Sequence, residues 1–169
     1  MKKILLLLFL GCALLQTGFS QGSLTWMSIE EAEAACKKKP RKIFVDVFTS
    51  WCGWCKKMDQ STFRDSLVLK YAGEKFYAVK LDAESRDNII FREKVFHYNE
   101  NMRANELAVM LLNGQMSYPS LVFLDEKLKP IQTHGGYADP AQFNMMLHFF
   151  GENAYRKKPM NDFSREFKP

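Results

Sequence analysis

The chain has 169 residues, enough for one domain with some additions. Hydrophobic residues make up 47% of it and 14 residues are phenylalanine, which excludes an intrinsically disordered chain. Without residues 1–20, which carry two of the lysines, the formal net charge falls from +5 to +3, too mild to indicate a nucleic-acid-binding protein. Three of the four cysteines then remain, too few for a scaffold stapled by disulfides.

Residues 1–20 have the pattern of a secretory signal peptide. Two lysines precede an apolar run at residues 4–15, which is shorter than the ~20 residues of a membrane span. A small-x-small cleavage site at residues 18–20 predicts a mature chain that starts at Gln21, in the periplasm or another extracytoplasmic compartment. The residues before Cys12 partly match a lipidation box, so anchoring as a lipoprotein is the less favoured alternative.

The first expected helix begins after Ser28. Ser28 and Glu31 have the spacing of a capping box, and the lysines before Pro40 are typical of a helix end. Ile29 and Cys36 fall on the apolar face of this helix. We therefore expect Cys36 to be a small buried core residue, because apolar burial raises a thiol pKa and makes the thiol unreactive.

Residues 43–48 and 51–55 contain the most informative pattern. The first run is continuously apolar apart from Asp46, which is typical of a central strand. It leads directly into Trp-Cys-Gly-Trp-Cys and then into an expected helix. Two cysteines three residues apart on a first helical turn can close a disulfide, and the positive end of the helix stabilises the attacking thiolate. Strand, cysteine pair and helix together predict thiol–disulfide exchange.

Three other roles for this pair stay open. A structural zinc site needs two more ligands, and the remaining cysteines and histidines form no second ligand pair. A structural staple across two residues closes almost no loop and would stabilise little. A copper chaperone would use a cysteine pair with a placed histidine, and the sequence offers no evident one.

The remaining elements follow from caps and hydrophobic periodicity. Asp65 is expected to cap a helix over residues 66–72 that ends at Gly73. Further expected elements are a strand at 76–81, an insertion at 85–117 with a hairpin near 89–98 and a helix at 105–113, strands at 121–124 and 131–134, and a helix from Asp139 to Gly151. Residues 152–169 are expected to form a polar, mobile C-terminal tail.

Residues 51–58 (Trp-Cys-Gly-Trp-Cys-Lys-Lys-Met), with Thr62-Phe63, Asp65-Ser66 and Val68, resemble the thioredoxin superfamily. Within it they are similar to secreted bacterial thioredoxin-like proteins related to the C-terminal domain of the transmembrane disulfide reductase. The resemblance covers residues 26–151. It implies an α/β thioredoxin fold, with a central mixed sheet and helices on both faces, an insertion before a cis-proline loop, and a thioredoxin-like domain over residues 21–151.

The resemblance also implies roles for individual residues. Cys52 matches the nucleophile, Cys55 the resolving thiol, Asp46 the buried carboxylate and Lys80 the lysine that approaches it from the next strand. A carboxylate buried in an apolar strand has a raised pKa and can accept the proton of Cys55, whatever the family. The alternatives are a hydrogen-bonded structural carboxylate for Asp46 and a surface lysine at the strand edge for Lys80.

Five residues are expected to bind substrate: Trp51, Gly53, Trp54, Tyr118 and Pro119. The resemblance implies a cis peptide bond before Pro119, in a loop that faces the sulfurs and pairs with an extended peptide. Trp54 carries no charge, so it lacks the thiolate stabilisation that a histidine would provide there. This favours a reducing or intermediate potential.

Together these features predict an extracytoplasmic thiol–disulfide oxidoreductase that acts on protein disulfides, most simply as a reductant. It would work as a monomer, without a metal or an organic cofactor, and would exchange electrons with a membrane-bound or soluble thiol donor. The rival interpretation is a thioredoxin-like binding or chaperone module of the cell envelope, in which the cysteines are incidental.

Overall fold

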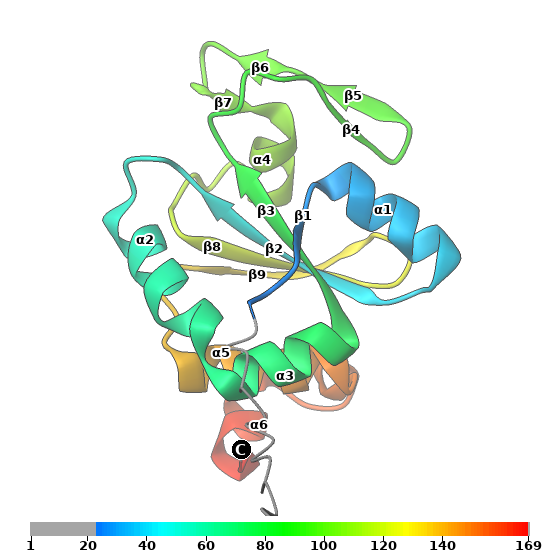
Figure 1. Ribbon diagram of the computed structural model, residues 1–169, viewed down its shortest axis with the longest axis vertical. Helices are drawn as coiled ribbons and strands as arrows, with labels where there is room; N and C mark the ends of the chain where they lie inside the picture. The colour runs from blue at the N-terminus through cyan, green and yellow to red at the C-terminus, as the bar shows by residue number, and fades with distance from the viewer. Residues whose placement is uncertain (1–22, 169) are drawn as a thin grey trace, which may run out of the picture.

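The computed structural model describes residues 23–168, and a five-stranded mixed sheet runs through it (Figure 1). The predicted signal peptide, with Cys12, lies outside the described residues. The strands, in spatial order, are β1 (Trp26–Met27), β3 (Phe76–Asp82), β2 (Lys42–Phe48), β8 (Ser120–Leu124) and β9 (Pro130–Gly135). The first three run parallel, and β8 and β9 are antiparallel to their neighbours. The apolar run at residues 43–48 is therefore a central strand, as predicted.

Helices cover both faces of this sheet, which is the predicted α/β architecture (Figure 1). One face packs against α1 (Ile29–Lys38) and α4 (Glu106–Leu111); the other packs against α2 (Gly53–Gln60), α3 (Ser66–Lys75) and α5 (Pro140–Gly151). The alternation of β2 makes this possible, because Val45 contributes to the first core and Phe44 to the second.

The predicted helix caps are present. Ser28 and Glu31 form the reciprocal capping box of α1, with hydrogen bonds of 3.2 and 2.8 Å. Asp65 accepts two backbone N–H groups at the start of α3, and Asp139 accepts one at the start of α5.

The prediction that Gly73 ends α3 is wrong. The helix continues through Gly73 to Lys75, and the N–H of Phe76 bonds to the Ala72 carbonyl. Ala72 and Phe76 are both buried in the core, so their packing holds the last turn in place. The Gly73 carbonyl accepts a hydrogen bond from Arg41 at 3.1 Å, which further anchors this turn.

The predicted insertion contains two short hairpins, formed by β4 (Ile89–Phe91) with β5 (Lys94–Phe96) and by β6 (Tyr98–Asn99) with β7 (Ala104–Asn105). Arg92 and Glu93, at the turn of the first hairpin, both have positive φ, as a two-residue primed turn requires. The hairpins lie at the end of the molecule opposite α6 (Met160–Glu166) (Figure 1).

Part of the segment at 85–117 is buried in the core of the domain. Helix α4, capped by Asn105, buries Leu107, Ala108 and Leu111 against the sheet in the same core as Val45. It is shorter than the predicted helix at 105–113, and Gly114 follows its end with a φ of +74°. The helix therefore belongs to the core, as do the buried side chains of Ile89 and Phe91 in the first hairpin.

The C-terminal segment is structured, so the prediction of a mobile tail is wrong. Residues after Gly151 form a 3-10 turn (Ala154–Arg156) and α6. Phe163 packs on Phe149 of α5 with ring centroids 5.3 Å apart, and Phe167 lies 5.0 Å from the His148 ring. The composition is polar, as the sequence indicates, but these two half-buried phenylalanines hold the segment against α5.

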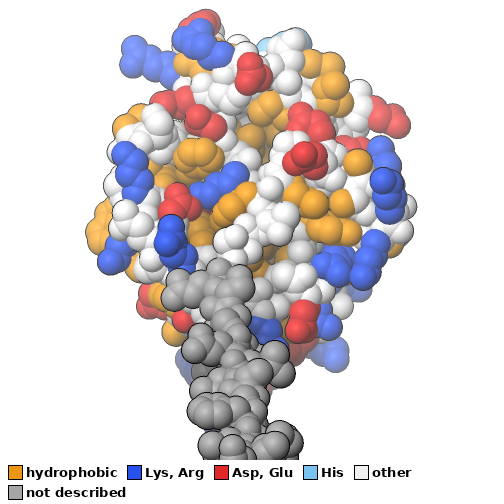
Figure 2. Space-filling model, in the orientation of Figure 1, with side chains coloured by type: hydrophobic (Ala, Val, Ile, Leu, Met, Phe, Trp, Pro, Cys, Tyr) orange, Lys and Arg blue, Asp and Glu red, His pale blue; other side chains and the backbone are white. Residues whose placement is uncertain are grey.

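The charged side chains on one face of the molecule fit the modest net charge. In Figure 2, basic and acidic side chains are interspersed over the visible face, so this face has no large patch of one sign. None of the helices in residues 23–168 is long and apolar enough to cross a membrane. Cys36 is buried, as predicted, and its thiol donates to the Arg41 carbonyl at 2.9 Å.

Candidate active site at the start of α2

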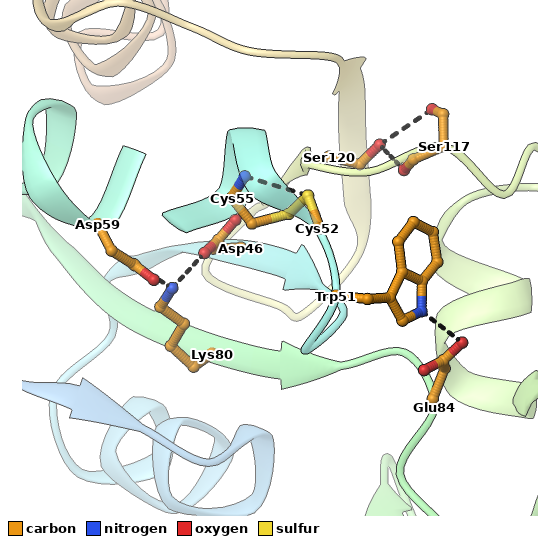
Figure 3. Close-up of a disulfide and its surroundings, with 9 residues drawn as sticks. All are labelled: Asp46, Trp51, Cys52, Cys55, Asp59, Lys80, Glu84, Ser117 and Ser120. Carbon is orange, nitrogen blue, oxygen red and sulfur yellow. Dashed lines mark hydrogen bonds and ion pairs between the residues drawn. A yellow bond between two sulfur atoms is a disulfide. The ribbon is translucent and has the colours of Figure 1, made fainter. Parts of the chain in front are cut away.

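Cys52 and Cys55 form a disulfide at the N-terminal end of α2 (Figure 3). Cys52 is the N-cap residue with an extended backbone, and Cys55 lies in the first helical turn, so their Cα atoms are 5.3 Å apart. The backbone N–H of Cys55 points at the Cys52 sulfur, with a nitrogen–sulfur distance of 3.1 Å. When the pair is reduced, the same N–H group and the helix dipole favour a thiolate on Cys52.

Asp46 lies on β2, the strand that precedes the cysteine pair in the sequence. It is fully buried and shares a strand face with Phe44, whose side chain packs against α2, α3 and α5. The Asp46 side chain therefore points to the same side of the sheet as α2. Burial raises the pKa of Asp46 from 3.8 to about 6, although the Lys80 ammonium acts in the opposite direction.

Lys80 lies directly opposite Asp46 in the register of β3 and β2. Its Nζ is 2.7 Å from Asp46 Oδ2 and also contacts the carboxylate of Asp59 on α2 (Figure 3). Three aromatic rings enclose the ammonium at 4.9 to 5.3 Å from their centroids, those of Trp26, Phe48 and Phe63. The structure thus brings together Asp46 and Lys80, as expected, and adds Asp59, which the sequence reasoning missed.

The two tryptophans of the motif, one before Cys52 and one between the cysteines, are exposed, Trp51 at 64% and Trp54 at 62%. Trp51 donates its indole N–H to Glu84 at 3.0 Å, and its ring meets the Tyr118 ring edge-on. Trp54 packs on Tyr137, with centroids 5.2 Å apart. The disulfide itself is almost covered, since Cys52 is 4% exposed. Two aromatic pairs therefore form the surface around the sulfurs.

The Tyr118–Pro119 peptide bond is cis, as the resemblance implies. The Trp51–Tyr118 contact ties this loop to the cysteine motif, and the Pro119 carbonyl accepts a hydrogen bond from Gly136 at 2.8 Å. Burial, together with the carboxylates of Glu84 and Asp82, raises the pKa of the Tyr118 hydroxyl.

Gly53 lies between the two cysteines on the exposed side of the turn. A Cβ atom added there would meet no atom within 4 Å, so close packing does not explain this glycine.

Three residues that contact the predicted site residues, Asp59, Glu84 and Tyr137, were not predicted from the sequence. Asp59 follows Cys55 by four residues, which places it on the same side of α2, and this spacing was the available clue. Glu84 and Tyr137 come from loops after β3 and β9, and only the tertiary structure brings them to the tryptophans.

Metal ligands do not gather around the cysteines. Between residues 23 and 168, no group of three or more His, Cys, Asp or Glu side chains could hold a metal ion.

The chain matches a known family over most of its length. The family model Thioredox_DsbH, described as a protein of unknown function, DUF255, matches residues 14–151. Among curated proteins, "Uncharacterized protein B0495.5" of Caenorhabditis elegans is 30% identical over 120 residues, which are 71% of this chain. Spermatogenesis-associated protein 20 of Homo sapiens is 32% identical over 60 residues, or 36% of this chain. The chain spans only 15% and 8% of the lengths of these two proteins.

Solved structures show the same fold. A DsbH oxidoreductase aligns over 81% of this chain and 88% of its own, with a TM-score of 0.56 and 20% identity. A thioredoxin-fold protein from Helicobacter pylori aligns over 89% of both chains, with a TM-score of 0.60 and 17% identity. A putative disulphide-isomerase from Bacteroides thetaiotaomicron covers 81% of this chain and 95% of its own, with a TM-score of 0.56 and 22% identity. At these identities the similarity shows the fold alone, and the predicted thioredoxin fold is confirmed.

Proposed function

The chain belongs to the Thioredox_DsbH family within the thioredoxin superfamily, and we propose that it is an extracytoplasmic thiol–disulfide oxidoreductase that reduces disulfides in protein substrates. The observation that carries this proposal is the Cys52–Cys55 disulfide at the start of α2, on the sheet face that buries Asp46. A nucleophile, a resolving thiol and a base are the groups that disulfide exchange needs.

The reaction proceeds by two exchanges. The Cys52 thiolate attacks one sulfur of the substrate disulfide, and the other sulfur leaves as a thiolate. Asp46 accepts the proton of Cys55, and the Cys55 thiolate then attacks Cys52 Sγ. The Cys52–Cys55 disulfide forms and the second substrate thiolate leaves, so two electrons have passed to the substrate. A dithiol donor returns the pair to its reduced state by the same exchange in reverse.

Two features support a reducing direction and a peptide substrate. Trp54 contributes no positive charge near Cys52, so the thiolate lacks the extra stabilisation that makes a pair strongly oxidising. The exposed tryptophans and the Tyr118–Pro119 loop offer an extended peptide apolar contacts beside backbone groups. We place the protein outside the cytoplasm because of the leader-like residues 1–20, and expect a monomer that needs no metal or organic cofactor.

Turnover and redox potential test this proposal. With a chemical dithiol as donor, the protein should reduce insulin disulfides, and Cys52→Ser should abolish the reaction while Cys36→Ala, the matched control, leaves it intact. A potential near the about −270 mV of thioredoxin supports the reducing direction, whereas one near the about −120 mV of DsbA would reverse it. No turnover by the folded wild type would favour the binding-module interpretation. Cell fractionation and N-terminal sequencing of the secreted chain, expected to begin at Gln21, test the location.

A further inference from the structure

Lys80 contacts two carboxylates at once, and these differ in their surroundings. Asp46 is fully buried on β2, whereas the Asp59 side chain on α2 is 44% exposed. Both contact the same ammonium group, which the strand register places opposite Asp46 (Figure 3). The position of this single cation therefore affects two acids, one in a dry environment and one beside water.

Asp46 depends on Lys80 for its electrostatic stabilisation. Among the described residues, neither of its carboxylate oxygens accepts a hydrogen bond of regular geometry, so the ion pair with Lys80 is its polar contact. The other sides of the ammonium face aromatic rings rather than further acids. Any change in how closely Lys80 approaches Asp46 must change how readily Asp46 takes up a proton.

A cavity of about 470 Å³ adjoins the outer side of this cluster. Asp59 and Lys80 line it together with Arg64, and Trp26, Phe63 and the chain at residues 23–24 form the rest of its wall. Arg64 is held at this place because its Nε donates to the Asp59 carbonyl at 3.1 Å. Asp59 thus meets Lys80 from the solvent side, and Asp46 meets it from the interior.

We propose that Asp59 is a positioning residue that acts through Lys80: it draws the ammonium toward the cavity, weakens the Lys80–Asp46 pair, and so keeps Asp46 able to accept the Cys55 proton near neutral pH. This inference rests on the proposed function of the cysteine pair. Its basis is the shared cation, because two carboxylates and one ammonium leave one negative charge in excess. The dehydrated carboxylate takes the proton, since burial disfavours its charged form.

The charges that face Asp46 come from two elements, Lys80 from β3 and Asp59 from α2, with Arg64 farther out on the cavity wall. Removing the Asp59 charge acts on Asp46 in one direction by two routes. Lys80 can then pair with Asp46 alone, and a nearby negative charge disappears. Both routes favour the ionised form of Asp46 and lower its pKa.

A titration of the Asp46 carboxylate by carbon-13 NMR, in the oxidised full-length protein, tests this directly. The wild-type midpoint is expected near 6. Asp59→Asn should lower it by about one pH unit, because charges within a few ångströms shift a pKa by that order. Asp59→Glu should restore the wild-type midpoint. Glu74→Gln removes one negative charge from the surface and serves as the matched control, with no expected shift. An unchanged midpoint in Asp59→Asn would overturn the proposal.

The kinetic counterpart is the pH profile of mixed-disulfide resolution by Cys55. Its midpoint should move down in Asp59→Asn by about the same amount as the NMR midpoint. A resolution profile that stays in place while the NMR midpoint moves would show that Asp46 is not the base in this step, and would also overturn the proposal. Failure of the proposed function looks different, because the wild-type protein would then show no disulfide turnover at any pH.

Discussion

The two faces of the sheet are packed with different side chains. The face that carries α2, α3 and α5 is rich in aromatic residues, and the face that carries α1 and α4 is mainly aliphatic. Rings on the aromatic face contact one another at centroid distances of 4.0 to 6.5 Å; they include Phe44, Phe63, Phe76, Phe123, Phe143 and Phe150. The aliphatic face includes Val45, Val47, Leu107, Leu111, Val122 and Leu124.

This difference accounts for where the charged groups lie. An ammonium group can lie against aromatic rings with some electrostatic gain, which an aliphatic wall does not provide. Lys80 and Asp46 accordingly belong to the aromatic face, as does the disulfide above them. The aliphatic face instead supports the two hairpins, whose β4 strand docks on α1. Trp51 contacts Glu84 and Tyr118, which precede and follow the hairpin segment in the sequence.

The largest effect on activity is expected from substitution of the cysteines, which lie on the aromatic face. Cys55→Ser should accumulate mixed disulfides with envelope proteins, because Cys52 still attacks and nothing resolves the product. Cys52→Ser should trap nothing, and turnover should fall to background in both variants. Non-reducing gels followed by mass spectrometry measure the trapped species. Equal trapping by the two variants would contradict the assignment of Cys52 as the nucleophile.

The second prediction concerns the buried charge on the aromatic face. The pKa of Asp46 is raised from 3.8 to about 6 on folding, so the folded state binds its proton more tightly than the unfolded state. Folding stability therefore falls as pH rises through this range, by about 3 kcal/mol at most. Asp46→Asn should raise the free energy of unfolding by up to that amount at pH 8, and by almost nothing at pH 4, where the wild-type carboxyl is already protonated.

Urea denaturation of the oxidised proteins at both pH values measures this difference, with Glu74→Gln as the control. Resolution of the mixed disulfide should slow in Asp46→Asn at the same time, because the base is lost. A stability gain that is the same at pH 4 and pH 8 would show that the gain comes from the packing of the asparagine side chain and not from loss of the carboxylate charge. Unchanged resolution kinetics would leave Asp46 with a structural role alone.

Features that depend on local sequence could be predicted, whereas features that depend on contacts between distant elements could not. Local signals were sufficient for the capping box at Ser28, the cap at Asp139, the buried strand with Asp46 and the cysteine pair. Family resemblance supplied the cis bond before Pro119. Asp59, Glu84 and Tyr137 were missed because their roles depend on contacts between elements far apart in the sequence. The tail prediction failed for a similar reason: Phe163 and Phe167 are few among polar residues, and their partners lie on α5.

The third prediction probes how the aromatic surface sets the redox potential. Trp54→His places a titratable base near Cys52 and, when protonated, should stabilise its thiolate. We expect a lower Cys52 pKa and a disulfide more oxidising by about 30 mV, which corresponds to about 1.4 kcal/mol for a two-electron couple. A thiol titration and a glutathione equilibrium measure both quantities. Trp54→Phe is the matched control, and an unmoved pKa in the histidine variant would mean that position 54 does not act on the sulfur.

The smallest effect is expected on the aliphatic face, where the hairpins meet α1. Glu33 accepts the Arg92 N–H at 2.9 Å, and Glu30 accepts the Ile90 N–H at 3.0 Å, so the open edge of β4 is covered by two carboxylates. Replacing the whole hairpin would expose the core, because Ile89 and Phe91 are buried in it. Weakening the β4 edge with Glu33→Gln is a gentler test of whether the hairpins help to hold protein substrates.

Glu33→Gln keeps an acceptor but removes its charge, and should weaken this contact by roughly 1 kcal/mol or less. Exchange of the Arg92 amide hydrogen should then rise up to about fivefold, while Glu93→Gln at the exposed hairpin turn should leave it unchanged. Turnover of a small disulfide should stay at the wild-type level, since the cysteine site lies on the other face. Turnover of insulin should fall, by about twofold, if the hairpins orient the Trp51–Tyr118 surface through Glu84. Faster amide exchange with unchanged insulin turnover would show that the hairpins stabilise the fold without selecting the substrate, and would confine the function of the molecule to its aromatic face.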